Sequence, residues 1–174
     1  NKLFPILALL FFSCDEDNAS PPIFWNLAYF VDDFADKTEQ AYLTNDYFIR
    51  GTFSNSATTK SDLNVRFIIH YDIFYKKPSV GILLYEYGSN HPVKGNIISQ
   101  NYKIRIKHNG KLVRIGNNNQ NYLTGVNFSD RILISEERDL LNLFLQGGEL
   151  KFKIIETGDY SKSEYSFEIN DFSG

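Results

Sequence analysis

Carboxylates gather in a short segment near the start of the chain. Asp32, Asp33 and Asp36 lie close together, and Glu39 follows shortly after them. Calcium takes about six to eight oxygen ligands in proteins, and clustered carboxylates can supply them. The spacing differs from that of an EF-hand loop. Acidic residues are also common in solvated turns between strands. Calcium at Asp32, Asp33 and Asp36 is therefore the alternative, and a plain turn is the expectation.

Cations alternate with apolar residues in a later segment. Lys103, Arg105 and Lys107 share one face of an extended strand, because successive side chains point to opposite faces. Lys111 and Arg114 follow after a turn. Three cations on one face concentrate positive potential and could contact an anionic glycan or a lipid headgroup. The plainer interpretation, which we favour, is the wet face of a half-buried hairpin, where lysine discourages edge pairing.

Residues for catalysis are sparse. His70 lies in an apolar strand, His91 precedes a proline in a loop and His108 falls in a turn. The sequence has no Gly-x-Ser-x-Gly, no His-Glu-x-x-His and no phosphate-binding loop. With Cys14 as the single cysteine, neither an internal disulfide nor a zinc site of several thiolates can form. We therefore expect no enzymatic activity, and no cofactor apart from the calcium alternative.

Tyrosines offer a further binding chemistry, because aromatic rings stack on sugars. Aromatic residues are also the usual filling of β-sandwich cores, which is the interpretation we prefer here. Trp25, the only tryptophan, stands in an apolar strand and is expected in the core. The candidate sugar-stacking residues are Tyr29, Tyr71, Tyr75, Tyr85 and Tyr87.

The first fourteen residues follow the pattern of an export signal. Lys2 precedes the apolar run Leu3–Phe12, which has half the length of about twenty residues that a membrane-spanning helix needs. The segment ending in Ser13-Cys14 resembles a lipobox, where a lipoprotein signal peptidase cleaves before a cysteine that carries lipid. The resemblance implies that residues 1–13 are a lipoprotein signal peptide and that Cys14 is the lipid attachment site. The alternative is an ordinary signal peptide followed by a stray thiol.

A polar tether follows the cysteine. Asp15-Glu16-Asp17 is similar to the acidic tract of Bacteroidetes-type lipoproteins that are sent to the cell surface. Pro21-Pro22 should stay extended and hold the next domain off the membrane. We expect residues 14–23 to be the lipidated cysteine and tether. The resemblance implies outer-membrane attachment with surface exposure, and a periplasm-facing position stays open.

Size and charge limit the kind of domain that the rest of the chain can form. The chain has 174 residues, of which 43% are hydrophobic, and residues 24–174 suffice for one domain with a substantial core. Lysine and arginine number 18 against 21 acidic residues, which gives a formal net charge of −3. Nucleic-acid-binding proteins usually carry a basic excess. A nucleic acid is therefore not an expected partner.

Short strands account for most of the expected domain. Strict alternation over 102–107, followed by Asn109-Gly110, predicts a hairpin, because both turn positions favour a positive φ. Polar loops are expected over 55–62, 89–100 and 116–129. Strands are expected over 24–31, 41–44, 47–54, 63–71, 80–87, 102–107, 111–115, 149–156 and 163–169.

One helix is expected over 136–146. Ser135 can cap it, acidic residues occupy its first turn, and Gly147-Gly148 ends it. Its apolar stripe is expected to consist of Leu140, Leu141, Phe144 and Leu145. The fold class is therefore all-β and mainly antiparallel, a β-sandwich or partly closed barrel with one short helix near the C-terminus.

The order of features is similar to that of a known family. Trp25, the acidic loop at 31–36, the segment 63–66 and the closing strand Tyr165–Ile169 together resemble the small exported β-sandwich domains of the invasion-associated locus B family. That family usually has disulfide cysteines, which this chain lacks, and we carry over no functional residue.

We therefore expect a membrane-anchored lipoprotein that acts as a non-catalytic binding or structural module at the cell envelope. Its partners are the membrane, through the N-terminal lipid, and an envelope protein or a glycan. The alternative is a calcium-dependent glycan binder or a hydrolase that uses the Asp32–Asp36 loop.

Overall fold

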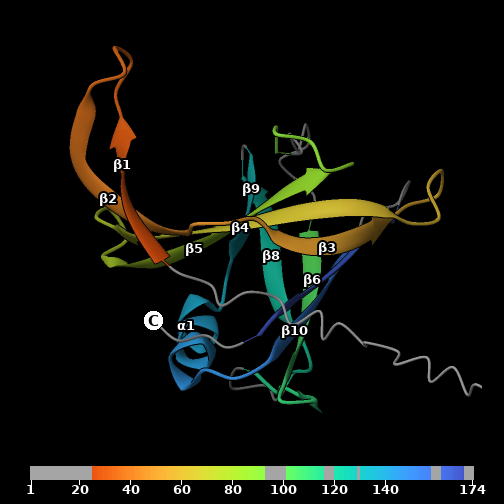
Figure 1. Cartoon of the computed structure of the whole chain (residues 1–174). Helices are drawn as coiled ribbons and strands as arrows, with labels where there is room; N and C mark the ends of the chain where they lie inside the picture. Colours follow the sequence, from red (N-terminus) through yellow and green to blue (C-terminus); the bar gives the residue numbers. More distant parts are fainter. Residues whose placement is uncertain (1–24, 93–100, 116–119, 129, 158–161, 171–174) are drawn as a thin grey trace, which may run out of the picture.

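Antiparallel strands dominate the described part of the chain, which comprises residues 25–92, 101–115, 120–128, 130–157 and 162–170 of a computed structural model. Eight strands close into a barrel and further strands extend it (Figure 1). The expected all-β class is confirmed, in the form of a closed barrel. The expected signal peptide at 1–13 and the tether at 14–23, with Cys14, lie outside the described residues. The elements are β1 (Trp25–Val31), β2 (Lys37–Asn45), β3 (Ile49–Ser54), β4 (Ser61–Asp72), β5 (Lys77–Glu86), β6 (Asn101–His108), β7 (Lys111–Leu112), β8 (Leu123–Phe128), β9 (Arg131–Ile134), α1 (Glu137–Gln146), β10 (Leu150–Glu156) and β11 (Glu164–Ile169).

The barrel closes through pairings of very different length. Its strand order is β4-β3-β11-β10-β6-β8-β9-β5, and β5 pairs again with β4. The β4–β5 pair runs from Leu63↔Glu86 to Asp72↔Lys77. The β5–β9 pair contains only Gly81↔Leu133 and Ile82↔Ile132. Closure removes the open edges that a flat sheet would expose, and the β5–β9 seam is its shortest contact.

Alternating side chains decide which side of each strand faces the interior. Strand β6 buries Tyr102, Ile104 and Ile106 and exposes the residues between them, as the sequence predicted. Phe67 lies among other interior rings, with its centroid 5.8 Å from that of Phe152. Packed apolar side chains fill the interior of small barrels in this way. The largest fully buried side chains are Phe53, Phe67, Leu63, Ile82, Ile104, Ile106, Leu123, Leu140, Leu150, Ile154, Ile169 and Val65.

The hairpin after β6 forms at the expected residues. Asn109 has φ 48° and Gly110 has φ 77°, as a tight hairpin turn of this type requires. The returning strand β7 is shorter than predicted and spans Lys111–Leu112. Beyond it, Ile115 makes an isolated bridge with Gln120.

The helix packs against one end of the barrel. The ring centroids of Phe144 and the interior residue Phe67 lie 5.3 Å apart, and those of Phe144 and Trp25 lie 6.0 Å apart. The predicted Ser135 cap is wrong, because the N-cap residue is Glu136, without a capping side-chain hydrogen bond. The Glu136 carboxylate instead accepts hydrogen bonds from the backbone and hydroxyl of Thr124, at 2.8 and 2.9 Å.

The apolar stripe of α1 differs from the prediction. Leu140, Leu143 and Phe144 are buried, whereas Leu145 is 86% exposed. Leu141 is only partly buried against the core. The buried face of α1 is thus rotated by about one residue from the predicted face. The helix ends as predicted, at Gly147, which has φ 67°.

Strands β8 and β9 were not among the predicted strands. The loop expected over 116–129 contains β8, whose inward positions include Gly125 and Asn127. Val126 and Phe128 point outward and are exposed. From Gly125 onward, β8 therefore inverts the usual pattern of apolar residues inside and polar residues outside, and the periodicity rule fails there.

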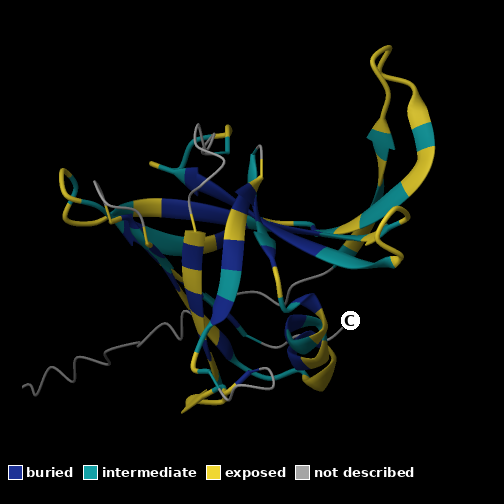
Figure 2. Cartoon of the chain, turned by 180° about the vertical axis from the view of Figure 1, so that it is seen from behind, coloured by how far each residue is buried: buried dark blue, intermediate teal, exposed yellow. Residues whose placement is uncertain are grey.

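An arm extends beyond the barrel wall. Strand β4 is long enough for its first half to pair with β3 and its second half with β2, at Tyr42↔His70, Leu43↔Ile69 and Thr44↔Ile68. The β1–β2 hairpin therefore projects from the barrel as a curved arm (Figures 1 and 2). Asn45 anchors its base: this fully buried amide accepts a 2.7 Å hydrogen bond from the backbone N–H of Phe67.

Candidate functional site

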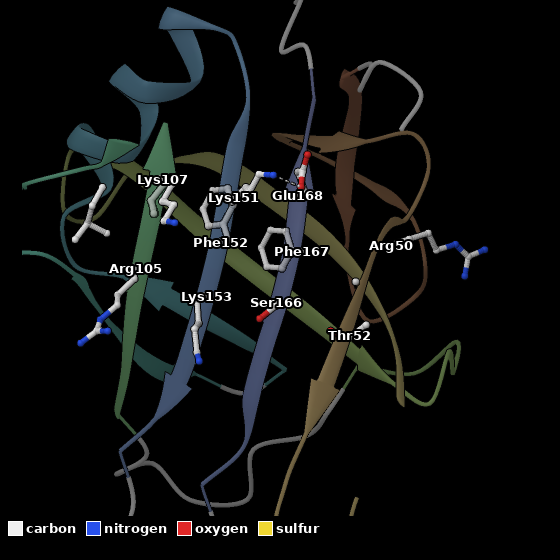
Figure 3. A pocket seen from close by; sticks show the side chains of 13 residues that line it. Arg50, Thr52, Arg105, Lys107, Lys151, Phe152, Lys153, Ser166, Phe167 and Glu168 are labelled. Carbon is white, nitrogen blue, oxygen red and sulfur yellow. Dashed lines mark ion pairs between the residues drawn. The ribbon is translucent and has the colours of Figure 1, made fainter. Parts of the chain in front are cut away.

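The predicted basic stripe lies on the outer wall of the barrel. Lys103, Arg105 and Lys107 project from β6 into solvent. The neighbouring strand β10 adds Lys151 opposite Lys107 and Lys153 opposite Arg105. Figure 3 shows Arg105, Lys107, Lys151 and Lys153 side by side on the two strands. We call this surface the cationic face; it consists of Lys103, Arg105, Lys107, Lys151 and Lys153.

The two lysines of β10 were missed in the sequence. The signal was present, because Lys151 and Lys153 alternate with Phe152 and Ile154 in the same way as the cations of β6 do. What the sequence did not show is that β10 lies beside β6, about forty residues away along the chain. Strand neighbours of this kind are set by tertiary pairing rather than by local pattern.

Some cations of this face already have acidic partners. Lys151 forms ion pairs with Glu149 and with Glu168, the latter at 3.0 Å, and Lys153 pairs with Glu164 at 2.8 Å. Hydrogen bonds to Glu149 and Glu168 raise the pKa of Lys151, and the bond from Lys151 lowers the pKa of Glu149. All of these groups lie at the surface, where such pairs add little stability.

Arg105 and Lys107 differ from the other cations. Both side chains are exposed, and neither forms an ion pair with any residue that the structure describes. The ammonium of Lys103 lies 5.0 Å from the centroid of the Tyr122 ring. The site therefore has two positive charges that are open to an external anion.

A shallow trough of about 640 Å³ lies beside these charges. Arg105 and Lys107 line it together with Thr52 and Ser166, which belong to β3 and β11. Figure 3 shows the short side chain of Ser166 on β11, the strand next to β10, and that of Thr52 on β3, one strand further away. Volumes of this order are typical of small-molecule sites. The strands β6 and β10 contribute cations to the trough, and β3 and β11 contribute the two hydroxyl groups together with Arg50 and the carboxylate of Glu168. Cations and hydroxyl groups together suit a ligand with both anionic and hydroxyl groups.

The acidic loop forms the tip of the arm. One carboxylate oxygen of Asp32 accepts hydrogen bonds of 2.9 Å from the backbone N–H groups of Phe34 and Asp36. Among the described residues, no three histidine, cysteine or acidic side chains come together in a way that could hold a metal ion. The Asp32 carboxylate thus stabilises the turn, and calcium at Asp32, Asp33 and Asp36 stays an untested alternative.

The tyrosines considered for sugar stacking do not share one surface. Tyr71 and Tyr75 lie by the β4–β5 turn, whereas Tyr87 lies at the opposite end of β5, and Tyr85 is buried. Tyr29 lies on the arm, where the ammonium of Lys37 is 3.4 Å from its ring centroid.

Trp25 is only partly buried, and it packs against the main core as expected.

The histidines are separated as well. The Nδ1 atom of His70 is buried without a hydrogen-bond partner in the described part of the chain. Burial, reinforced by Arg131, lowers the pKa of His70. His108 has a structural contact that the sequence did not suggest, because its Nε2 lies 2.7 Å from the carbonyl oxygen of Gly147, just after α1. His91 is exposed in its loop.

Comparison of the chain with protein-family models, with curated proteins and with solved structures gave no match. Within the residues that the structure describes, no helix combines the length and the apolar character needed to cross a bilayer. The chemistry of the site itself is therefore the basis for any functional conclusion.

Proposed function

We propose that the protein is a lipid-anchored, non-catalytic binding module of the cell envelope that holds an anionic glycan on its cationic face. The observation that carries this proposal is the pair Arg105 and Lys107. Both are exposed, both lack an acidic partner among the described residues, and both line the trough. The anionic groups of such a glycan are carboxylates, sulfates or phosphates.

Charge segregation supports this choice of ligand. The chain as a whole has a formal net charge of −3, so its cationic face does not follow from a general basic excess. The guanidinium of Arg105 can donate two parallel hydrogen bonds to one carboxylate or sulfate, and Lys107 adds a second charge nearby. The hydroxyls of Thr52 and Ser166 can hydrogen-bond to sugar hydroxyls. Electrostatic attraction of this kind weakens as salt increases.

The anchoring part of the proposal rests on the N-terminal sequence. Lys2, the apolar run Leu3–Phe12 and Cys14 are in the order of a lipoprotein signal, and a polar tether follows. One acyl chain gives only marginal membrane binding, whereas two or more give stable attachment. Attachment to the outer membrane on the outward side would bring the domain to where envelope glycans are found.

Binding can be tested on the full chain with a uronate polysaccharide, a sulfated polysaccharide and a neutral glucan as probes. We expect the two anionic probes to bind and the double variant Arg105→Ala/Lys107→Ala to weaken binding about tenfold, or about 1.4 kcal/mol. Calorimetry at low and high salt measures both effects.

The matched control is Lys60→Ala/Arg138→Ala. It also removes one lysine and one arginine, both exposed and outside the cationic face. If both double variants lost the same affinity for the anionic probes, the loss would come from the change in overall charge and not from the cationic face. Failure of every anionic probe to bind the wild-type protein would overturn the glycan proposal.

The anchor is tested separately. Mass spectrometry of the protein from its native membranes should find acyl groups on Cys14 and no residues 1–13. Cys14→Ser should move the protein into the soluble fraction with its circular dichroism unchanged. Recovery of unacylated wild-type protein from the soluble fraction would disprove the anchor and leave the glycan test unaffected.

A further inference from the structure

Strand β1 forms the end of the sheet. It pairs with β2 along one edge, and no described strand pairs with the other. An open edge presents unpaired N–H and C=O groups on which another strand can add, and proteins usually protect such edges with charges or proline. The seven residues of β1, WNLAYFV, include neither. The one irregularity, between Tyr29 and Val31, falls at the end near the tip of the arm.

One face of β1 is apolar and exposed. Leu27 and Val31 are 60% and 61% exposed, and Tyr29 lies between them on the same face. Leu43 of β2 pairs with Leu27 on one side and with Ile69 of β4 on the other. Ile69 packs against the main core of the barrel. The arm therefore carries the apolar inner face of the barrel outward, beyond the opposite wall that would cover it (Figure 2).

Contiguous apolar surface of this kind on a soluble domain marks a place of association. Strand β1 is also complementary to itself. If two copies pair antiparallel about a two-fold axis at Ala28, Leu27 of each copy lies opposite Tyr29 of the other. In the same register Asn26 lies opposite Phe30, and Trp25 opposite Val31. Aliphatic and aromatic side chains pair well across strands, and no like charges meet.

We propose that β1 is the contact surface of a homodimer, in which the arms of two copies form one continuous antiparallel sheet centred on Ala28. A two-fold axis normal to the sheet places the exposed faces of the two arms side by side, so that Leu27 and Tyr29 of one copy contact Tyr29 and Leu27 of the other across the new strand pair. The contact is closed and does not propagate. Because a shift of one residue would exchange the faces, the apolar residues also define the register.

The area of this contact predicts a reversible dimer. An aromatic side chain offers about 150–250 Å². Leu27, Tyr29 and Val31, which are only partly exposed, therefore contribute at most on the order of 100 Å² each, or about 600 Å² for both copies. That is below the roughly 1,200 Å² of a standard stable interface. We expect dissociation in the micromolar range.

Cross-linking tests the predicted axis. In the register proposed here, Ala28 faces its own counterpart at a Cβ separation within reach of a disulfide. Ala28→Cys in the full chain, oxidised in intact cells, should give a disulfide-linked dimer at least fivefold more abundantly than Lys60→Cys, which is exposed away from the arm. The wild-type chain, whose only cysteine is Cys14, gives the background. A product whose mass shows a different protein, or a yield equal to that of Lys60→Cys, would overturn the proposal.

Charge exchange tests the register in the same Ala28→Cys chain. Leu27→Lys with Tyr29→Lys places like charges opposite each other at two pairs and should lower the cross-linking yield about tenfold. Leu27→Lys with Tyr29→Glu places opposite charges there and should retain the dimer. Circular dichroism checks that both remain folded. Equal yields from the two combinations would disprove the register, and monomeric wild-type protein at concentrations above the micromolar range in sedimentation experiments would disprove the dimer.

Discussion

At the scale of single residues, two buried tyrosines, Tyr102 and Tyr165, lie near acidic side chains. The hydroxyl of Tyr165 donates a 2.8 Å hydrogen bond to the carboxylate of Glu86. Burial, followed by the charges of Glu156 and Glu86, raises the pKa of Tyr102 to about 12. Burial and the same Glu86 also raise the pKa of Tyr165. Both phenols therefore keep their protons in the folded state at pH values where an unfolded chain loses them.

This difference predicts loss of stability in alkali. Since both folded pKa values lie above the unfolded value of about 10, the stabilisation is complete below pH 10 and is lost as the pH rises toward 12. Each tyrosine should lower the free energy of unfolding by about 1.4 kcal/mol per pH unit in that range. Tyr102→Phe should remove one such contribution, as measured by urea unfolding at several pH values.

Tyr47→Phe is the control, because the Tyr47 side chain is 69% exposed. It should leave the pH dependence as it is in the wild type. If Tyr102→Phe and Tyr47→Phe behave alike, the buried phenol of Tyr102 is not the source of the alkaline sensitivity.

At the scale of elements, local pattern predicted those strands whose inner residues are apolar. Strand β6 and its Asn109-Gly110 turn were predicted nearly to the residue, because alternation and turn chemistry agree there. Strand β8 was missed, since Gly125 and Asn127 point inward and Phe128 points outward. The helix was predicted in place but not in its cap.

The candidate site was predictable only where its residues belong to one strand with a clear local pattern. Lys103, Arg105 and Lys107 were found because one strand carries all three. Lys151 and Lys153 belong to the same surface only because β10 pairs with β6. No local signal carries that information, and hydroxyl groups such as that of Ser166, from a third strand, depend on a further pairing. A surface made by several strands can be predicted only when the order of the strands in the sheet is known.

Close approach of β3 and β11 supplies a prediction for one glycine. A Cβ added to Gly51 would lie 2.4 Å from the carbonyl oxygen of Ser166 and 2.8 Å from the Cβ of Phe167. The obstacle includes backbone, so the strands themselves would have to separate. Gly51→Ala should therefore lower the free energy of unfolding by about 3 kcal/mol, as measured by urea unfolding. Ser54→Ala, in the same strand, should change it by less than about 1 kcal/mol, and similar losses in both variants would contradict the steric explanation.

At the scale of the whole molecule, the long strand β4 links the barrel to the β1–β2 arm. The first half of β4 pairs with β3 in the barrel wall, and its second half pairs with β2 of the β1–β2 arm. The cationic face lies on β6 and β10, on a different part of the wall. The proposed glycan binding and the proposed pairing of arms therefore use separate surfaces, and variants of one should leave the other intact.

Barrel closure gives the last prediction. Because β5 and β9 share only two residue pairs, whereas β4 and β5 share ten from Leu63↔Glu86 to Asp72↔Lys77, the β5–β9 seam should open first. Local opening requires less free energy where fewer hydrogen bonds and buried contacts are broken. Native-state hydrogen exchange should therefore show the amides of β9 exchanging with a free energy at least about 2 kcal/mol below that of the central amides of β4. Equal protection of β9 and β4 would mean that the barrel opens only as a whole, with its shortest seam as strong as its longest.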